Sequence, residues 1–259
     1  GSKISVDEYN KACRETVMQF KDMWDDVTRK MGYWVDLDDP YITFENSYIE
    51  SVWHLIQTLY KKGYLYKGYT IQPYSPAAGT GLSSHELNLP GCYKEVKDTT
   101  VVAMFEVKKN DLSSKLFDDE NEDVRILAWT TTPWTLPSNT ALTVGKKIEY
   151  VKVKTLNKYN DKPISVILAK QLVSKWFGGK NQPEIIEETS VGTGADLADL
   201  RYASLFDFDN PIEDLLGGTD AYKVIIGDFV TTEDGTGVVH TAPSFGADDQ
   251  KVAKMNGIG

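Results

Sequence analysis

The second half of the chain consists of short segments rich in β-branched residues, and this pattern constrains the fold more than any other feature. From about Lys97 onward, Gly, Asp, Asn or Pro bounds each segment, which is typical of strands separated by turns. The predicted strands are TTVVAMFEV (99–107), VRILAWTTT (124–132), IEYVKVKT (148–155), PISVILA (163–169), AYKVIIGDFV (221–230) and GTGVVHTA (235–242). Many short strands leave unpaired edges unless the sheet closes, so we expect a closed or partly closed barrel.

Two connections between these strands can also be predicted. Residues 170–177 are expected to form a helix that interrupts the strands. Asp234-Gly235, shortly before the sequence GVVH (237–240), is a dipeptide that favours a two-residue turn, so a hairpin is expected there.

The N-terminal part of the chain has a helical character instead. Apolar residues recur at roughly helical spacing over 5–30, and a second helix is expected over about 45–62, ending before a glycine. YLYKGYTIQPY (64–74) alternates as a strand does. The predicted fold class is therefore α+β, with a helical linking segment over 3–96 followed by a mostly β, barrel-like domain with peripheral helices over 97–259.

The overall charge limits which partners the chain can bind. Its formal net charge is −10, which argues against a broad nucleic-acid surface because such surfaces are basic. The acidic run DDENED (118–123) is expected to be a solvated loop. No apolar run has the length of a membrane span, and two distant cysteines, Cys13 and Cys92, indicate a reducing compartment, the cytoplasm. Gly1-Ser2 resembles a cloning remnant, so we expect a piece of a larger protein.

A segment rich in hydroxyl groups follows the strand predicted over 124–132. Pro133 and Pro137 cannot donate to a sheet or continue an α-helix, so the backbone must leave the sheet there. This is expected to expose five polar side chains near the strand end: Thr130, Thr131, Thr132, Thr135 and Asn139. A pocket for a polar substrate explains this composition. The ordinary strand preference of threonine explains it too, and composition alone favours that simpler interpretation.

A second segment, GTGVVHTAPSFGADD, combines a histidine with paired acids. A strand leads to His240, Pro243 ends that strand, and the paired acids Asp248 and Asp249 follow a glycine. Asp249 can instead cap a following helix, and a lone histidine is more often structural than catalytic. Both interpretations stay open on the residues alone.

Other site chemistries lack the residues they need. The three histidines (His54, His85 and His240) have no cysteine pair near them, so a zinc site lacks ligands. Neither a Gly-rich phosphate loop followed by Lys-Ser/Thr nor a G-x-S-x-G elbow is present. The remaining groups are hydroxyls, one amide, one imidazole and one or two carboxylates, which together can bind an ammonium group and orient a water molecule.

The two polar segments together carry a resemblance to a known family. TTTPWTLPSN (130–139) with GTGVVHTAP-x-x-G-x-DD (235–249) closely resembles the editing domain of isoleucyl-tRNA synthetases, an insertion that hydrolyses mischarged Val-tRNA(Ile). The valyl and leucyl enzymes have Arg-Pro-(Glu/Asp)-Thr where this chain has Thr-Pro-Trp-Thr (132–135). MGYWVDLDDPYITFENSYIESVW (31–53) and LYKGYTIQPYSPAAGTGLSSHE (65–86) resemble the stretch that joins this insertion to the catalytic domain, so the resemblance covers essentially the whole chain.

The resemblance implies roles for the polar residues. The five residues Thr130, Thr131, Thr132, Thr135 and Asn139 would line the editing pocket and position the terminal adenosine, the ester and a water molecule. Trp134 would shape the site, and His240 would form part of the wall around the amino-acid side chain. Asp249 would bind the α-ammonium group, with Asp248 beside it as a substrate-binding residue. Hydrolysis in this family relies on bound water and tRNA hydroxyls more than on a protein base.

The chain departs from the family pattern in three places. Ser75-Pro76-Ala77-Ala78 stands where bacterial members often carry Cys-x-x-Cys, so we expect no structural zinc and no loss of activity with a chelator. Some relatives have a histidine at the position of Phe245, and no role is expected for that position. The His-x-Gly-His and Lys-Met-Ser-Lys-Ser signatures of amino-acid activation are missing from the sequence, so this chain is not expected to make an aminoacyl-adenylate.

The expected activity is therefore that of an aminoacyl-tRNA deacylase within an isoleucine-tRNA ligase. Its expected partners are the acceptor end of tRNA(Ile), valine as an ester or adenylate, and the rest of the synthetase chain, with neither DNA nor a membrane and with the fragment as a monomer. Editing is expected to need no cofactor, whereas the full-length ligase would use ATP and magnesium. The alternatives are a non-catalytic module that docks the tRNA acceptor end, and an inert fragment whose pocket assembles only in the full enzyme.

Overall fold

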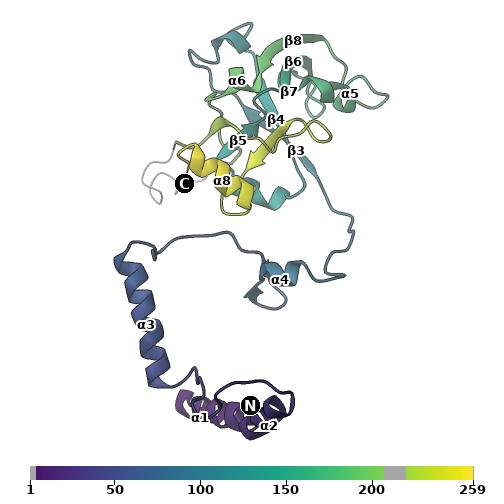
Figure 1. Cartoon of the computed structure of the whole chain (residues 1–259). Coiled ribbons are helices and arrows are strands. Elements are labelled where there is room, and N and C mark those ends of the chain that lie inside the picture. Colours follow the sequence, from purple (N-terminus) through teal and green to yellow (C-terminus); the bar gives the residue numbers. More distant parts are fainter. Residues whose placement is uncertain (1–3, 207–219, 259) are drawn as a thin grey trace. The chain divides into compact units, whose positions relative to one another are not determined.

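The computed structural model describes residues 4–206 and 220–258, and the chain divides into two compact units, 1–69 and 70–259. The first unit is helical. Its helices are α1 (Val6–Met18), α2 (Lys21–Lys30) and α3 (Asn46–Lys61), as Figure 1 shows. The predicted domain boundary between residues 96 and 97 stays a prediction.

The single helix predicted over 5–30 is wrong, because the segment forms two helices, α1 and α2. Phe20 lies between them with φ −115° and ψ 16°, outside the helical range. The start of α1 is stabilised by a reciprocal capping box between Ser5 and Glu8. Apolar residues keep their helical spacing through the break, so the pattern alone predicts one helix. The helix predicted over about 45–62 is confirmed as α3.

The strand predicted over 64–74 is wrong for nearly all of its length. Only its last residue is in a strand, β1 (Tyr74–Ser75), which pairs antiparallel with β2 (Thr80–Gly81). In the turn between them, Ser75 Oγ accepts a hydrogen bond from the backbone N–H of Ala78 at 3.2 Å. A segment with alternating residues forms a strand only where a neighbouring strand is present to bond with it. The rest of this segment has no such neighbour in the described structure.

Among the described residues of the second unit, eight strands form one sheet. They are β3 (Val101–Glu106), β4 (Val124–Thr130), β5 (Ala141–Val144), β6 (Glu149–Leu156), β7 (Pro163–Ala169), β8 (Glu187–Thr193), β9 (Lys223–Ile226) and β10 (Val238–Thr241). All six predicted strands are present, and β5 and β8 were not predicted. The short helical elements are α4 (Ser84–Leu87), η1 (Ser114–Leu116), η2 (Pro133–Ser138), η3 (Lys170–Leu172), α5 (Val173–Trp176), α6 (Gly194–Leu197) and α8 (Ala247–Met255). The helix predicted over 170–177 is confirmed as η3 followed by α5.

Strand β4 holds the sheet together. It pairs antiparallel with β3 along its length, parallel with β7 over Val124–Ile126 and parallel with β10 at Trp129. Strand β5 lies between β10, with which it is antiparallel, and β9, with which it is parallel. The hairpin predicted at Asp234-Gly235 is therefore wrong, because β5 separates the two strands. Gly235 is needed there for a close approach, since a Cβ on it would lie 2.8 Å from Trp129 Cε3.

The sheet curls into a partly closed barrel, which confirms the predicted barrel-like α+β fold. In Figure 1 the strands of this unit wrap around one another rather than lying flat. The segment after α6 bridges the two open sides, because Tyr202 pairs with Val107 beyond β3 and Arg201 pairs with Lys223 of β9. Backbone hydrogen bonds follow these bridges, including Lys108 N to Arg201 O at 2.8 Å. Partial closure leaves fewer backbone groups without partners.

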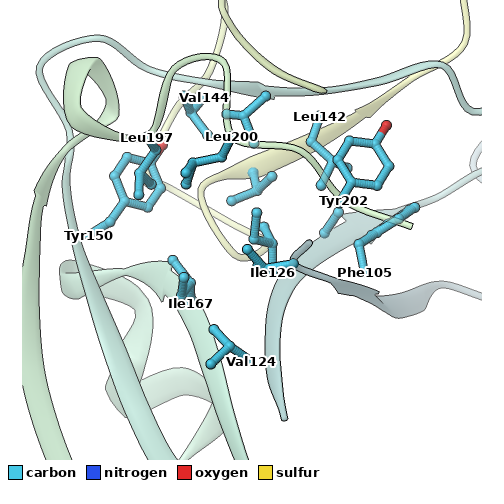
Figure 2. Close-up of a cluster of buried hydrophobic side chains, with 14 of the residues drawn as sticks. Phe105, Val124, Ile126, Leu142, Val144, Tyr150, Ile167, Leu197, Leu200 and Tyr202 are labelled. Carbon is cyan, nitrogen blue, oxygen red and sulfur yellow. The ribbon is translucent and has the colours of Figure 1, made fainter. Parts of the chain in front are cut away.

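Alternate residues of the strands fill the inside of the barrel. Phe105, Ile126, Leu142 and Tyr202 are fully or almost fully buried in this cluster, and Figure 2 shows the Tyr202 ring near Leu142 and Phe105. The opposite faces of β4, β6 and β7 form a second apolar cluster under α5. Helix α8 covers β5 and β9 from outside, where Val252 packs in a cluster with their residues. No helix in the described part of the chain is long and apolar enough to cross a membrane.

The acidic run 118–123 is a loop, but it is not simply solvated as predicted. The side chain of Lys152 on β6 is only 3% exposed, and its ammonium group lies 2.9 Å from Asp118 Oδ2 and 3.2 Å from Glu122 Oε1. Lys152 also donates to the carbonyl of Leu116 at 2.9 Å, and Ser165 donates to Glu122. Charge pairing with a buried lysine therefore ties this loop to the sheet, which the composition of the run does not reveal.

Candidate functional site

The parallel pairing of β4 and β10 brings the two polar segments together. Trp129 and Val239 are direct partners in the register, so the next residues along each strand, Thr130 and His240, lie side by side at the same edge of the barrel. Side chains of alternate strand residues point to opposite faces. Thr130 and His240 therefore share the inward face with Ile126 and Val238 of the core.

After β4 the backbone leaves the sheet at Pro133, as predicted, and forms the 3₁₀ helix η2 rather than an irregular turn. Proline is tolerated in a first helical turn because the N–H groups there have no partner within the helix. Thr135 N and Thr135 Oγ1 both donate to Thr132 O, at 3.0 Å and 2.8 Å. These bonds turn Thr135 back toward the strand end.

A pocket of about 370 Å³ lies at this edge, within the usual size range for small-ligand sites. Its lining residues are Trp129, Thr130, Thr131, Thr132, Trp134, Thr135, Val239, His240, Phe245 and Asp249. Of the residues predicted for the site, all but Asn139 and Asp248 line this pocket. Roles of individual residues stay predictions.

The predicted exposure of the hydroxyl-rich segment is correct only in part. Thr131, Thr132 and Trp134 are exposed, whereas Thr130, Thr135 and Asn139 are buried. The buried side chains are hydrogen-bonded inside the barrel edge, which makes their burial favourable. Thr130 Oγ1 lies 3.3 Å from Thr132 Oγ1 and accepts from Thr132 N at 3.1 Å. The pocket therefore has a fixed hydroxyl floor and an exposed hydroxyl rim.

His240 is held on both sides of its ring. Its Nε2 lies 3.0 Å from Thr135 Oγ1, a residue 105 positions away in the sequence. Its Nδ1 lies 2.8 Å from Asn139 Nδ2, an amide that also donates to Ala141 O at 2.8 Å. An amide nitrogen only donates, so Nδ1 accepts and the ring proton is on Nε2. Neither ring nitrogen is therefore free to act as a base.

The electrostatic environment agrees with a neutral His240. Burial lowers the pKa of His240 from 6.5 to about 4, against a smaller opposing effect of its hydrogen bond with Thr135. The geometry gives an additional reason. A second proton on the ring would place an N–H of His240 against the N–H of Asn139, which is a repulsive arrangement.

Asp249 contributes a half-buried carboxylate to the pocket. Its Oδ2 accepts from the backbone N–H of Ala242 at 3.1 Å. Burial raises the pKa of Asp249, the Ala242 hydrogen bond lowers it, and the charge of Asp248 raises it further. The N-cap of α8 is Gly246 and makes no side-chain cap hydrogen bond, so Asp249 does not cap the helix in the way considered from the sequence. A Cβ at Gly246 would lie 3.1 Å from Asp249 Cγ, so glycine leaves room for this carboxylate.

Three residues of the pocket were not predicted from the sequence. Trp129 and Val239 immediately precede Thr130 and His240 on their strands, and alternation assigns them to the opposite face, so it gave no signal for them. Phe245, to which no role was assigned, lies at the pocket and is 57% exposed. Asp248 is exposed to solvent beside the site. Within the described ranges, no group of three or more His, Cys, Asp or Glu side chains is arranged to hold a metal ion.

The burial of neutral His240 predicts a loss of stability in mild acid. Because its pKa is about 4 in the folded protein against 6.5 when exposed, the unfolded chain binds more protons between these values. The stabilising contribution of His240 is therefore complete above pH 6.5 and decreases as the pH falls to about 4, by on the order of 3 kcal/mol. The measurement is the free energy of urea-induced unfolding at several pH values.

His240→Gln provides the comparison, because glutamine does not titrate. We expect the wild type to lose more stability than this variant between pH 6.5 and pH 4. The raised pKa of Asp249 acts in the opposite direction in both proteins, so the difference between them isolates His240. Parallel pH curves for the two proteins would contradict a neutral, buried His240.

Comparison with known proteins identifies the family. The family model described as tRNA synthetases class I (I, L, M and V) matches residues 1–188. The chain belongs to the class I tRNA synthetases. Within this class it is similar to isoleucine–tRNA ligases, which confirms the resemblance predicted from the sequence. The enzyme of Cytophaga hutchinsonii is 55% identical over 270 residues, covering 100% of this chain and 23% of that protein. The enzyme of Porphyromonas gingivalis is 54% identical over 271 residues with the same coverage.

The class I synthetase chain thus spans less than a quarter of the length of these relatives. Among solved structures it is similar to the editing domain of a cytosolic leucyl-tRNA synthetase from P. knowlesi, with a TM-score of 0.42 and 15% identity. That match covers 61% of this chain and 62% of the other. This likeness is partial, and the assignment to the family does not depend on it.

Proposed function

We propose that the pocket between β4 and β10 is the editing site of an isoleucyl-tRNA synthetase, at which the ester of mischarged Val-tRNA(Ile) is hydrolysed. The observation that carries this proposal is the meeting of the two polar segments, because threonine hydroxyls and a half-buried carboxylate line the same pocket. The similarity to isoleucine–tRNA ligases over the whole chain supports it. Valyl-adenylate is a second possible substrate of the same pocket.

The hydrogen bonds and the exposure of the pocket residues support a distinct task for each kind of group. Asp249 has one carboxylate oxygen on the backbone of Ala242 and a second that can accept from an α-ammonium group. The exposed hydroxyls of Thr131 and Thr132 can orient a water molecule and the ester. His240 has both ring nitrogens engaged, so it serves as wall rather than base. Hydrolysis then relies on an oriented water and on hydroxyls of the tRNA.

An editing site is useful because selection by a first pocket is weak. A binding pocket distinguishes two substrates that differ by one methylene group by only about 1–3 kcal/mol. This is a general range, and the usual example of it is the discrimination of isoleucine from valine by the isoleucyl enzyme. Burial favours the larger side chain by about 0.8 kcal/mol per methylene. A second pocket can therefore accept valine and refuse isoleucine only with a rigid wall, where an extra methylene costs typically about 1–3 kcal/mol. Thr132 and His240 are the candidates for this wall.

His240→Ala is expected to make the pocket accept isoleucine. Removing the ring opens space for one more methylene at a wall that Thr135 and Asn139 otherwise hold in place. The measurement is the ratio of deacylation rates for Val-tRNA(Ile) and Ile-tRNA(Ile), which we expect to move toward unity by about tenfold, as the loss of a 1–3 kcal/mol penalty implies. If both rates fall together at an unchanged ratio, His240 orients the ester or the water and does not select by size.

The proposed activity is tested directly with this chain. Deacylation of Val-tRNA(Ile) is measured, with Ile-tRNA(Ile) as the control substrate and with the full-length synthetase in parallel. Hydrolysis of the valyl ester alone supports the proposal. Binding of the tRNA acceptor end without hydrolysis by either protein would support the alternative, a non-catalytic docking module. Activity of the full-length enzyme alone would mean that the pocket of this chain is completed by the rest of the protein.

The proposal also specifies cofactors and partners. Hydrolysis of an ester by water is expected to need no cofactor, whereas amino-acid activation by the full-length ligase would need ATP and magnesium. The partners would be the acceptor end of tRNA(Ile), valine as an ester or adenylate, and the rest of the synthetase chain. Location in the cytoplasm, a monomeric fragment and a lack of structural zinc at Ser75–Ala78 stay predictions.

A further inference from the structure

A buried chain of hydrogen bonds leads from the barrel core to the pocket. The hydroxyl of Tyr202 donates to Asn139 Oδ1 at 2.7 Å, and Asn139 Nδ2 lies 2.8 Å from His240 Nδ1. His240 Nε2 lies 3.0 Å from Thr135 Oγ1, which donates to the carbonyl of Thr132 at 2.8 Å. Tyr202, Asn139, His240 and Thr135 are all buried. Of the residues in this series of hydrogen bonds, only Tyr202 lies outside both polar segments.

The direction of each bond follows from the direction of the first. A carbonyl oxygen only accepts, so the Tyr202 hydroxyl must donate to Asn139 Oδ1. This orients the amide of Asn139 with its nitrogen toward Ala141 O and His240 Nδ1. Nδ1 must then accept, which places the ring proton of His240 on Nε2, and Nε2–H donates to Thr135 Oγ1.

The core fixes the position of the Tyr202 hydroxyl. The ring of Tyr202 is fully buried, with its centroid 5.2 Å from that of Phe105 and 6.1 Å from that of Tyr222, both in edge-to-face contact. Figure 2 shows Tyr202 beside Phe105 and Leu142 within this cluster. Burial raises the pKa of Tyr202 well above its ordinary value, so its hydroxyl keeps its proton and stays a donor.

We infer that Tyr202 is a positioning residue for the pocket: through Asn139 it fixes the tautomer of His240 and thereby the orientation of Thr135 at the pocket floor. Its effect on deacylation rests on the proposed editing function, whereas its effect on the tautomer does not. Without the Tyr202 donor, only the bond from Asn139 Nδ2 to Ala141 O holds the amide, so in part of the population the amide can turn over and present its oxygen to His240 Nδ1. The ring proton then moves to Nδ1, Nε2 becomes an acceptor, and Thr135 must donate to it instead of to Thr132 O.

The test replaces Tyr202 by phenylalanine and records the imidazole nitrogen and carbon NMR signals of the whole 259-residue chain. His54 and His85 are exposed, and the signals of His240 are assigned as those lost in His240→Gln. In the wild type we expect the Nε2–H form of His240. In Tyr202→Phe we expect a mixture of both tautomers.

Tyr150→Phe is the matched control. The hydroxyl of Tyr150 is also buried in the barrel core and donates to Gly237 O at 2.6 Å, but it has no bond to Asn139. Both variants lose one buried hydroxyl, so a general loosening of the core affects both. We expect the tautomer of His240 to change only in Tyr202→Phe.

Deacylation of Val-tRNA(Ile) provides the functional measurement. We expect Tyr202→Phe to lower kcat about two- to tenfold, the range that one net hydrogen bond represents, with KM nearly unchanged. An unaltered His240 tautomer in folded Tyr202→Phe would overturn the inference, as would an Nδ1–H tautomer in the wild type, which needs no variant to fold. A shifted tautomer, with no deacylase activity in either this chain or the full-length synthetase, would leave the positioning role in place and refute the proposed function.

Discussion

Asp249→Ala is expected to lower the rate of Val-tRNA(Ile) deacylation at least about tenfold while the second unit stays folded. A carboxylate that faces an ammonium group makes a charge-assisted hydrogen bond worth about 1.5–3 kcal/mol, and more where water is excluded. Asp249 is half-buried and lines the pocket, so part of this shielding is present. Loss of the bond should weaken binding of the transition state by a corresponding factor.

Two further variants separate charge from structure. Asp249→Asn keeps an oxygen that can accept from Ala242 N–H but removes the charge, so it should lose activity with little loss of stability. Asp248→Ala removes the neighbouring acid, which is exposed and does not line the pocket, and it should have a smaller effect. Kinetics are measured beside thermal unfolding of each variant. Equal losses for Asp248→Ala and Asp249→Ala, or unfolding of Asp249→Ala, would contradict a specific role of Asp249 in binding.

Lys152→Met is expected to destabilise the protein by about 3–5 kcal/mol. Methionine keeps most of the volume of the side chain but removes the ammonium group that Asp118, Glu122 and the carbonyl of Leu116 share. The Glu122 side chain is only 9% exposed, so its charge is left without its partner inside the protein. Removing one member of a buried ion pair costs more than the pair contributes, because the remaining charge stays poorly solvated.

The size of this effect is measured by urea-induced unfolding against two references. Lys170→Met breaks an exposed pair with Glu149, in which the side chains are 56% and 65% exposed, and should change stability by less than about 1 kcal/mol. Combining Lys152→Met with Glu122→Gln should recover part of the loss, since the unpaired charge is gone. If Lys152→Met behaves like Lys170→Met, the buried lysine does not stabilise the loop over 118–123.

Local sequence identifies strands well where they are buried on both faces. PISVILA was predicted over the same residues that form β7, because a short, largely apolar run with β-branched residues is typical of a buried strand. Strands β5 and β8 were missed. β5 has only four residues, ALTV, beside the polar segment, and β8 reads EETSVGT, whose polar residues conceal its pairing with β6. Pairing with bonded neighbours, β9 and β10 for β5 and β6 for β8, makes these segments strands, and a neighbour distant in the sequence is not visible locally.

The pocket shows the same division. Local backbone chemistry explains why β4 ends before Pro133 and why β10 ends just after His240. Local chemistry does not reveal that β4 and β10 are parallel neighbours. The Asp234-Gly235 dipeptide even indicated a different pairing, a hairpin of β9 with β10. The long-range pairing of Trp129 with Val239 placed Thr130 beside His240.

The sequence by itself determined the chemistry available to this protein: the hydroxyls, amide, imidazole and carboxylates of two segments, the ends of the strands that carry them, and membership of the synthetase family. Only the tertiary structure decided which of these groups are exposed and which are locked. It buried Thr135 and Asn139, held both nitrogens of His240, and linked them to Tyr202 in the core. The physical reason is that burial and hydrogen-bond direction depend on partner residues that are far apart in the sequence. Thr135 and His240, for example, are 105 positions apart, and only the folded sheet brings their side chains within hydrogen-bonding distance.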